Sequence, residues 1–145
     1  MGKKALKDVP LQEITLRKYE EPANLSGREL AKKFLLSVGL LQPGESRDII
    51  VDIFYTLLLA RKGQQILSAE HFAEKLKSKP GASPPNVRRQ LRRLKELKLV
   101  EHLAQGYRIT EQGKLTPVIN DFIVQYLVNP SIERVKQYAD ELDKI

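Results

Sequence analysis

The chain of 145 residues contains no cysteine and no tryptophan, and it has only two histidines. The absence of cysteine excludes disulfides and thiolate metal sites. His71 and His102 lie on different predicted elements with no cysteine beside them, so we interpret them as ordinary helix-surface or strand residues and expect no metal site. The eight glycines are scattered singly, which leaves no glycine-rich loop to hold a phosphate or a nucleotide cofactor.

Catalytic and membrane signatures are equally scarce. The sequence shows no nucleophile paired with a base, and adjacent carboxylates such as Asp140 and Glu141 belong to a polar helix face, so we expect no enzyme and no cofactor. No apolar run approaches the roughly 20 residues that cross a bilayer. Met1–Lys7 is basic but lacks the apolar core of a signal peptide. A cytoplasmic protein, associated with the nucleoid if prokaryotic, is the resulting prediction.

Positive charge is abundant, but it is confined to one stretch. Residues 61–98 carry 11 of the 25 Lys and Arg and only 3 of the 18 Asp and Glu, a net charge of +8, whereas the other 107 residues have a net charge of −1. A basic segment on a near-neutral body indicates a polyanionic partner. Only nine residues are aromatic, which argues against a protein that stacks single-stranded bases.

The most basic part of this stretch, residues 84–98, is predicted to be an amphipathic helix. Ser83 is a suitable N-cap, and Pro84 and Pro85 fit a first turn, where a missing N–H group costs nothing. Apolar side chains recur at helical spacing and form one stripe: Val87, Leu91, Leu94 and Leu97. Arginines lie opposite this stripe or on its flank: Arg88, Arg89, Arg92 and Arg93. A charge run of this kind is often only a solvated helix face, but the flanking segments favour a binding surface.

Short elements flank this helix on both sides. Residues 67–76 predict a short helix, and the Pro-Gly pair at 80–81 forces a turn after it. Residues 99–110 predict two strands joined by a tight turn at 104–106. Two short helices followed by a small hairpin are the plan of a winged helix-turn-helix.

The segment Leu67–Gly113 resembles the DNA-binding domain of prokaryotic, especially archaeal, winged helix-turn-helix transcriptional regulators. The resemblance rests on Leu67–Glu70 at the second helix, on Ser83–Leu94 in the third, and on Tyr107–Gly113 at the exit from the wing. In such regulators the third helix enters the major groove and the wing follows the backbone. The resemblance implies a sequence-specific double-stranded DNA-binding protein with recognition helix 84–98. The implied contact residues are Ser83, Asn86, Arg88, Arg89, Arg92, Arg93 and Arg108.

Two features depart from this pattern. The wing tip at 104–106 contains no Arg or Lys, and the turn between the second and third helices is longer than in a simple helix-turn-helix. Many winged helices bind proteins instead. A protein–protein interaction module in a transcription or chromosome-associated assembly is therefore an alternative, and a binder of double-stranded RNA is another. Nothing in the sequence identifies a small-molecule effector.

Length and composition support one folded core with helical extensions. The expected fold is mainly α with a small β-hairpin. We divide the chain into a loosely ordered segment at 1–25, a helix and linker at 26–45, the winged helix-turn-helix domain at 46–113, and helices at 114–145. Ser46 is predicted to cap an almost wholly apolar helix, which must be the buried spine of the domain.

The last third of the chain predicts two further helices. The first begins at Pro117 and ends at Asn129-Pro130, and the second begins at Ser131. The second helix carries apolar residues at a 3-4-3 spacing typical of a helix pair: Ile132, Val135, Ala139 and Leu142. These helices either cover the domain's own core or, with the helix predicted at 26–38, form the interface of a homodimer. Such a dimer would present two recognition helices to successive turns of DNA.

Overall fold

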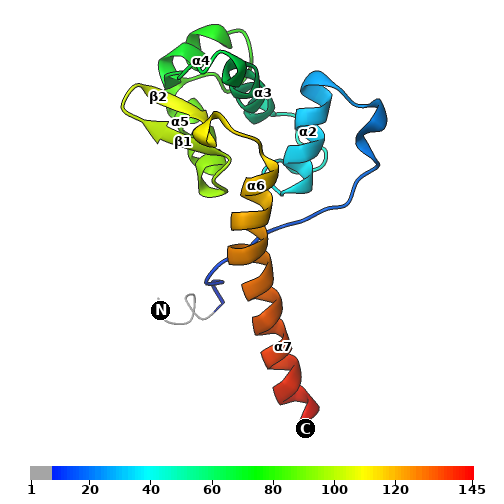
Figure 1. Cartoon of the computed structure of the whole chain (residues 1–145). Coiled ribbons are helices and arrows are strands. Elements are labelled where there is room, and N and C mark those ends of the chain that lie inside the picture. Colours follow the sequence, from blue (N-terminus) through cyan, green and yellow to red (C-terminus); the bar gives the residue numbers. More distant parts are fainter. Residues whose placement is uncertain (1–7) are drawn as a thin grey trace.

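The chain is mainly helical and carries one two-stranded antiparallel hairpin, as the sequence predicts (Figure 1). The structure, a computed structural model, describes residues 8–145, so Met1–Lys7 of the segment predicted to be loosely ordered lie outside the described residues. In chain order the elements are η1 (Pro22–Asn24), α2 (Gly27–Ser37), α3 (Ile49–Lys62), α4 (Ala69–Lys75), α5 (Pro84–Glu96), β1 (Val100–Leu103), β2 (Gly106–Ile109), η2 (Thr110–Gln112), α6 (Thr116–Val118), η3 (Ile119–Val128) and α7 (Asn129–Asp143).

Helix α3 is the central helix of the body, the name used here for the elements from α2 to β2. It contacts α2, α5 and β2. Its side chains are buried around most of the helix, and Val51, Ile53 and Phe54 have no exposed surface. A helix that is apolar on nearly all sides is stable only when it is surrounded by protein. The predicted buried spine is therefore confirmed.

The start of α3 differs from the prediction. The N-cap is Asp48, not Ser46. Asp48 forms ion pairs with Arg28 at 3.1 Å and with Lys32 at 3.6 Å, both from α2. These contacts fix the chain at Asp48, so the helix begins at Ile49.

The second and third predicted helices and the hairpin form where the sequence places them. The hydroxyl of Ser68 caps α4 by accepting a hydrogen bond from the N–H of His71 at 3.1 Å. Leu67, just before α4, forms a bridge beside β2 and exchanges two backbone hydrogen bonds with Tyr107, at 2.9 and 2.8 Å. The hairpin is thereby tied to the beginning of α4.

The C-terminal helix runs without a break from Thr116 to Asp143 through α6, η3 and α7, and it projects away from the body (Figure 1). The predicted stop at Asn129-Pro130 is therefore wrong. The helix accommodates the proline because η3 is π-helical, with the N–H of Asn129 bonded to the carbonyl of Val124, five residues back. Pro130, which lacks an N–H group, takes the second position of the α-helical segment that follows.

Residues 8–25, the strap, lie outside the helical body and contact the end of α2. The backbone N–H of Arg17 donates to the carbonyl of Ser37 at 2.9 Å. Its guanidinium donates to the carbonyls of Leu36 at 2.9 Å and Leu41 at 3.2 Å. Leu36 lies in the last turn of α2, where carbonyls lack partners within the helix, and Leu41 lies in the loop that follows, so one arginine binds both segments. The strap is fixed to α2 at this point, a contact that the sequence does not indicate.

Candidate nucleic-acid interface

Helix α5 presents one face to the core and the other to solvent. Val87, Leu91 and Leu94 have no exposed surface, which confirms the predicted apolar stripe. Burying each such side chain contributes about 1.5–3 kcal/mol relative to leaving it exposed, so the helix is firmly seated. The opposite face is exposed and mostly basic, with one acidic residue: Arg88, Arg89, Arg92, Lys95 and Glu96.

The arginines of this exposed face differ in their availability to a ligand. The guanidinium groups of Arg89 and Arg92 form no hydrogen bond or ion pair with any residue between 8 and 145. Arg88 pairs with Glu70 of α4 at 2.5 Å, and both side chains are about half exposed or more. An exposed ion pair contributes only about 0–1 kcal/mol, so a phosphate or a guanine base can replace Glu70 at small cost.

Two predicted contact residues are bonded within the protein instead. Arg93 donates to the carbonyl of Leu40 at 2.6 Å, and Asn86 donates to the carbonyl of Gly81 at 2.7 Å. Both hydrogen bonds hold α5 against earlier parts of the chain, so these side chains position the helix. Ser83 occupies the N-cap of α5 and is exposed, and its hydroxyl forms no capping hydrogen bond.

The single basic residue of the hairpin is neutralised. Arg108 donates from Nε to Oε2 of Glu101 at 2.5 Å, and the backbone N–H of Glu111 donates to the same oxygen at 2.9 Å. Burial alone would raise the pKa of Glu101, but these hydrogen bonds outweigh it and lower the pKa. The hairpin therefore presents little net positive charge to a polyanion.

A largely buried ion network holds the turn that precedes α5. Asp52 of α3 is 8% exposed and accepts hydrogen bonds from Arg28 of α2 at 2.9 and 3.0 Å. The same carboxylate accepts a hydrogen bond from Lys79, in the turn between α4 and α5, at 2.7 Å. One carboxylate thus joins α2, α3 and the turn, and Lys79 contributes to the fold instead of to the exposed basic face.

The fold adds one candidate that the sequence reasoning missed. Arg47 is exposed just before α3, and it lines a cavity of about 200 Å³ together with Arg89, Arg93 and Glu45. Its guanidinium forms no ion pair in the described part of the chain. Arg47 lies outside the basic segment 61–98, and no sequence pattern connects it with α5. Only the packing of α5 beside α3 brings these arginines together.

Other kinds of site find little support. In residues 8–145 there is no group of three or more side chains that could hold a metal ion. None of the helices over the same residues has the length and apolar character of a membrane span. Comparison with protein-family models, curated proteins and solved structures found no match. The functional inference therefore rests on α5 and its surroundings.

Proposed function

We propose that this chain is a sequence-specific double-stranded DNA-binding protein, a transcriptional regulator, that inserts α5 into the major groove. The observation that carries the proposal is the exposed basic face of α5, where Arg89 and Arg92 have no partner among the described residues. The planar guanidinium group can bind guanine O6 and N7, or a phosphate, through two hydrogen bonds. Because α5 is anchored by buried side chains, these groups project from a rigid support.

The order of the elements supports a winged helix-turn-helix. Helices α3, α4 and α5 precede the hairpin, and the bridge between Leu67 and Tyr107 ties the hairpin to α4. In winged helix-turn-helix regulators the helix before the wing enters the groove. Helix α5 holds that position in the chain.

The contacts assign different roles to the basic residues. Arg89 and Arg92 are the first candidates to contact bases or phosphates. Arg88 becomes a third when a DNA group replaces Glu70 as its partner. Arg47 adds a phosphate contact beside α5, because it lines the same cavity as Arg89. The hairpin contributes little affinity in this proposal, since its arginine is already paired.

The neutral hairpin favours a second candidate function. A winged helix that docks on an acidic protein surface, in a transcription or chromosome-associated assembly, needs a basic helix but no basic wing. Both candidates predict binding that weakens with salt. They differ in the partner, because only the regulator retains affinity for purified duplex DNA.

The test is binding to random-sequence duplex DNA across a salt series. Each phosphate contact contributes about −0.9 to the slope of log affinity against log salt concentration. The double variant R89A/R92A should therefore show a slope shallower by about 2 than the parent chain. A matched control, R134A/K144A, removes the same charge from exposed positions on α7 or just beyond it and should keep the parent slope.

The outcomes separate the candidates. A steep slope that becomes shallow only in R89A/R92A supports the DNA proposal and justifies selection of a preferred site. In that site, replacing a base-contacting arginine should cost about 1–3 kcal/mol and relax the preference at one position. If all three proteins bind duplex DNA weakly and with little dependence on salt, the proposal is rejected in favour of an acidic protein partner. A preference for duplex RNA over duplex DNA would also reject it.

In the proposed function the protein binds DNA as a homodimer. A twofold pair of chains would place two copies of α5 on one duplex and match a palindromic site.

A further inference from the structure

Helix α7 carries an apolar seam that its own chain leaves uncovered. The seam consists of residues spaced 3, 4 and 3 apart: Ile132, Val135, Ala139 and Leu142. Ile132 is 47% exposed, Val135 66% and Leu142 65%, and α7 contains no buried residue. Of the two interpretations of the sequence, the one in which α7 covers the domain's own core is therefore wrong.

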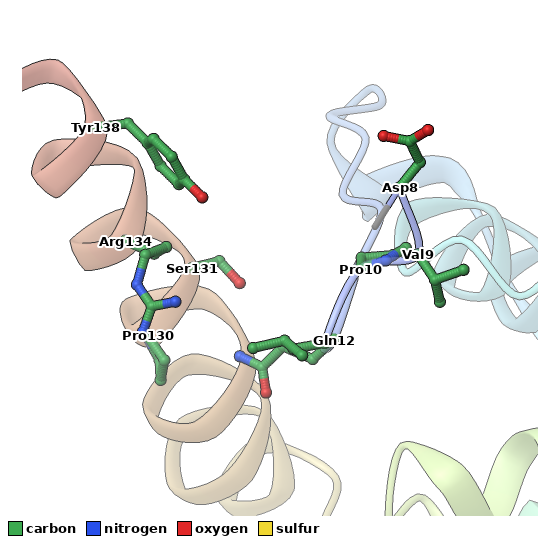
Figure 2. A pocket seen from close by; sticks show the side chains of 9 residues that line it. Asp8, Val9, Pro10, Gln12, Pro130, Ser131, Arg134 and Tyr138 are labelled. Carbon is green, nitrogen blue, oxygen red and sulfur yellow. The ribbon is translucent and has the colours of Figure 1, made fainter. Parts of the chain in front are cut away.

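The strap lies along another face of α7 and does not cover the seam: the α7 residues that share a cavity with it are Pro130, Ser131, Arg134 and Tyr138. Figure 2 shows Gln12 of the strap extending toward α7, whereas the side chain of Val9 points away from it. The space between the strap and α7 is a cavity of about 680 Å³. Val9 is 56% exposed and Tyr138 68% exposed, so both side chains remain largely accessible.

We propose that the seam on α7 binds α7 of a second copy of this chain in a parallel, in-register helix pair. Apolar residues at a 3-4-3 spacing are the repeat by which one helix packs against another helix of the same repeat. The 15 residues of α7 span about 22 Å at 1.5 Å per residue, and the seam runs along this length. Among the described helices, α7 is the one that leaves such a seam exposed, so a second α7 is the matching partner.

The charges beside the seam favour the parallel orientation. In a parallel pair, residue i of one helix lies beside residue i+5 of the other. Ser131 then lies beside Lys136, and Tyr138 lies beside Asp143, where its hydroxyl can donate to the carboxylate. An antiparallel pair with the seam fully overlapped would instead place Lys136 beside its own copy. Like charges at that position oppose the antiparallel pair.

A parallel pair also fits the position of α7 in the molecule. Figure 1 shows the helical body of the chain at one end of α7. A twofold axis along a parallel pair would therefore place both bodies at the same end. Two copies of α5 can then approach one duplex from the same side. This inference extends the proposed function, but the helix pair stands on the seam alone and is tested without DNA.

The first test is the oligomeric state of the full chain by sedimentation velocity over a series of protein concentrations. The parent chain should move from monomer to dimer as the concentration rises. Val135→Glu places a charge in the seam and should abolish the dimer, whereas Gln137→Glu introduces the same residue on the outer face of α7 and should not. Circular dichroism should show both variants folded, because neither position is buried. A parent chain that stays monomeric, or a dimer that survives Val135→Glu, would overturn the proposal.

The orientation is tested by a single engineered cysteine, since the natural chain has none. In the parallel pair Leu142→Cys meets its own copy, so mild oxidation should give a disulfide-linked dimer. In the antiparallel pair the two cysteines would lie about 15 Å apart, too far for a disulfide. Gln137→Cys on the outer face is the control for random collision. A dimer in which Leu142→Cys cross-links no better than this control overturns the parallel arrangement. Neither result decides whether the protein binds DNA, which the salt series tests separately.

Discussion

Replacing Asp52 with asparagine tests whether one carboxylate holds the body together. The side chain of Asp52 is 10% exposed, and it accepts two hydrogen bonds from Arg28 and one from Lys79. Asparagine keeps the size of the side chain but removes its charge. The change therefore isolates the electrostatic part of the contact from its packing.

The expected loss follows from the exposure of the partners. Removing one member of a fully buried ion pair costs about 3–5 kcal/mol, because the other charge stays buried and unpaired. The side chain of Arg28 is 31% exposed and that of Lys79 is 44% exposed, so water can partly replace the carboxylate at both. Asparagine also still accepts one hydrogen bond. We therefore expect Asp52→Asn to lower the free energy of unfolding by about 2–3 kcal/mol.

Asp48→Asn is the matched control. Asp48 pairs with the same arginine at 3.1 Å, but its side chain is 25% exposed and its second partner, Lys32, lies 3.6 Å away. Its loss should be below about 1 kcal/mol. Urea denaturation followed by circular dichroism at neutral pH measures both variants against the parent chain. If Asp52→Asn costs no more than Asp48→Asn, the reasoning about this network is refuted.

The same carboxylate should make stability depend on pH. Burial alone would raise the pKa of Asp52, but the hydrogen bonds from Arg28 and Lys79 outweigh it and hold the pKa below the ordinary value of 3.8. A carboxylate whose pKa is lower in the folded state stabilises the fold above its unfolded pKa and loses this contribution as the pH falls through its folded pKa. The difference in stability between the parent chain and Asp52→Asn should therefore be constant near neutral pH and shrink below about pH 4.

Two glycines give further predictions. Gly106→Ala should lower the free energy of unfolding by at least about 2 kcal/mol, because its Cβ would lie 2.4 Å from the backbone oxygen of Leu67 and the backbone there has a φ of +148°. Thermal unfolding measures this loss, and an unchanged melting temperature would contradict the close approach of the hairpin to α4. Gly81→Ala should cost less, about 1–2 kcal/mol, because its φ of +89° is unfavourable but the atom at 2.9 Å is the end of the Asn86 side chain, which can move aside more easily than backbone. A Gly81→Ala loss larger than that of Gly106→Ala, in the same melting experiment, would reverse the expected order.

Local patterns in the sequence determined the kinds of elements and most of their positions. The stripe through Val87, Leu91 and Leu94 predicted which face of α5 is buried, because helical periodicity and burial are linked at short range. Ser68 as a cap and the two short strands within 99–110 were also predicted from local features, and both were confirmed. The predictions failed where a local rule was overridden. A proline usually ends a helix. At Pro130 the helix continues, because the π-helical segment before it removes the need for the missing N–H group.

Tertiary structure decided which charged side chains are available. Arg93 and Arg89 look alike in the sequence, yet Arg93 binds a carbonyl 53 residues away while Arg89 has no partner among the described residues. Arg47 joins this group only through the packing of distant segments. The exposure of the seam on α7 was likewise open in the sequence, since its spacing serves a core helix and an interface helix equally well. Periodicity fixes which face of a helix is apolar, but only the path of the whole chain determines whether anything covers that face.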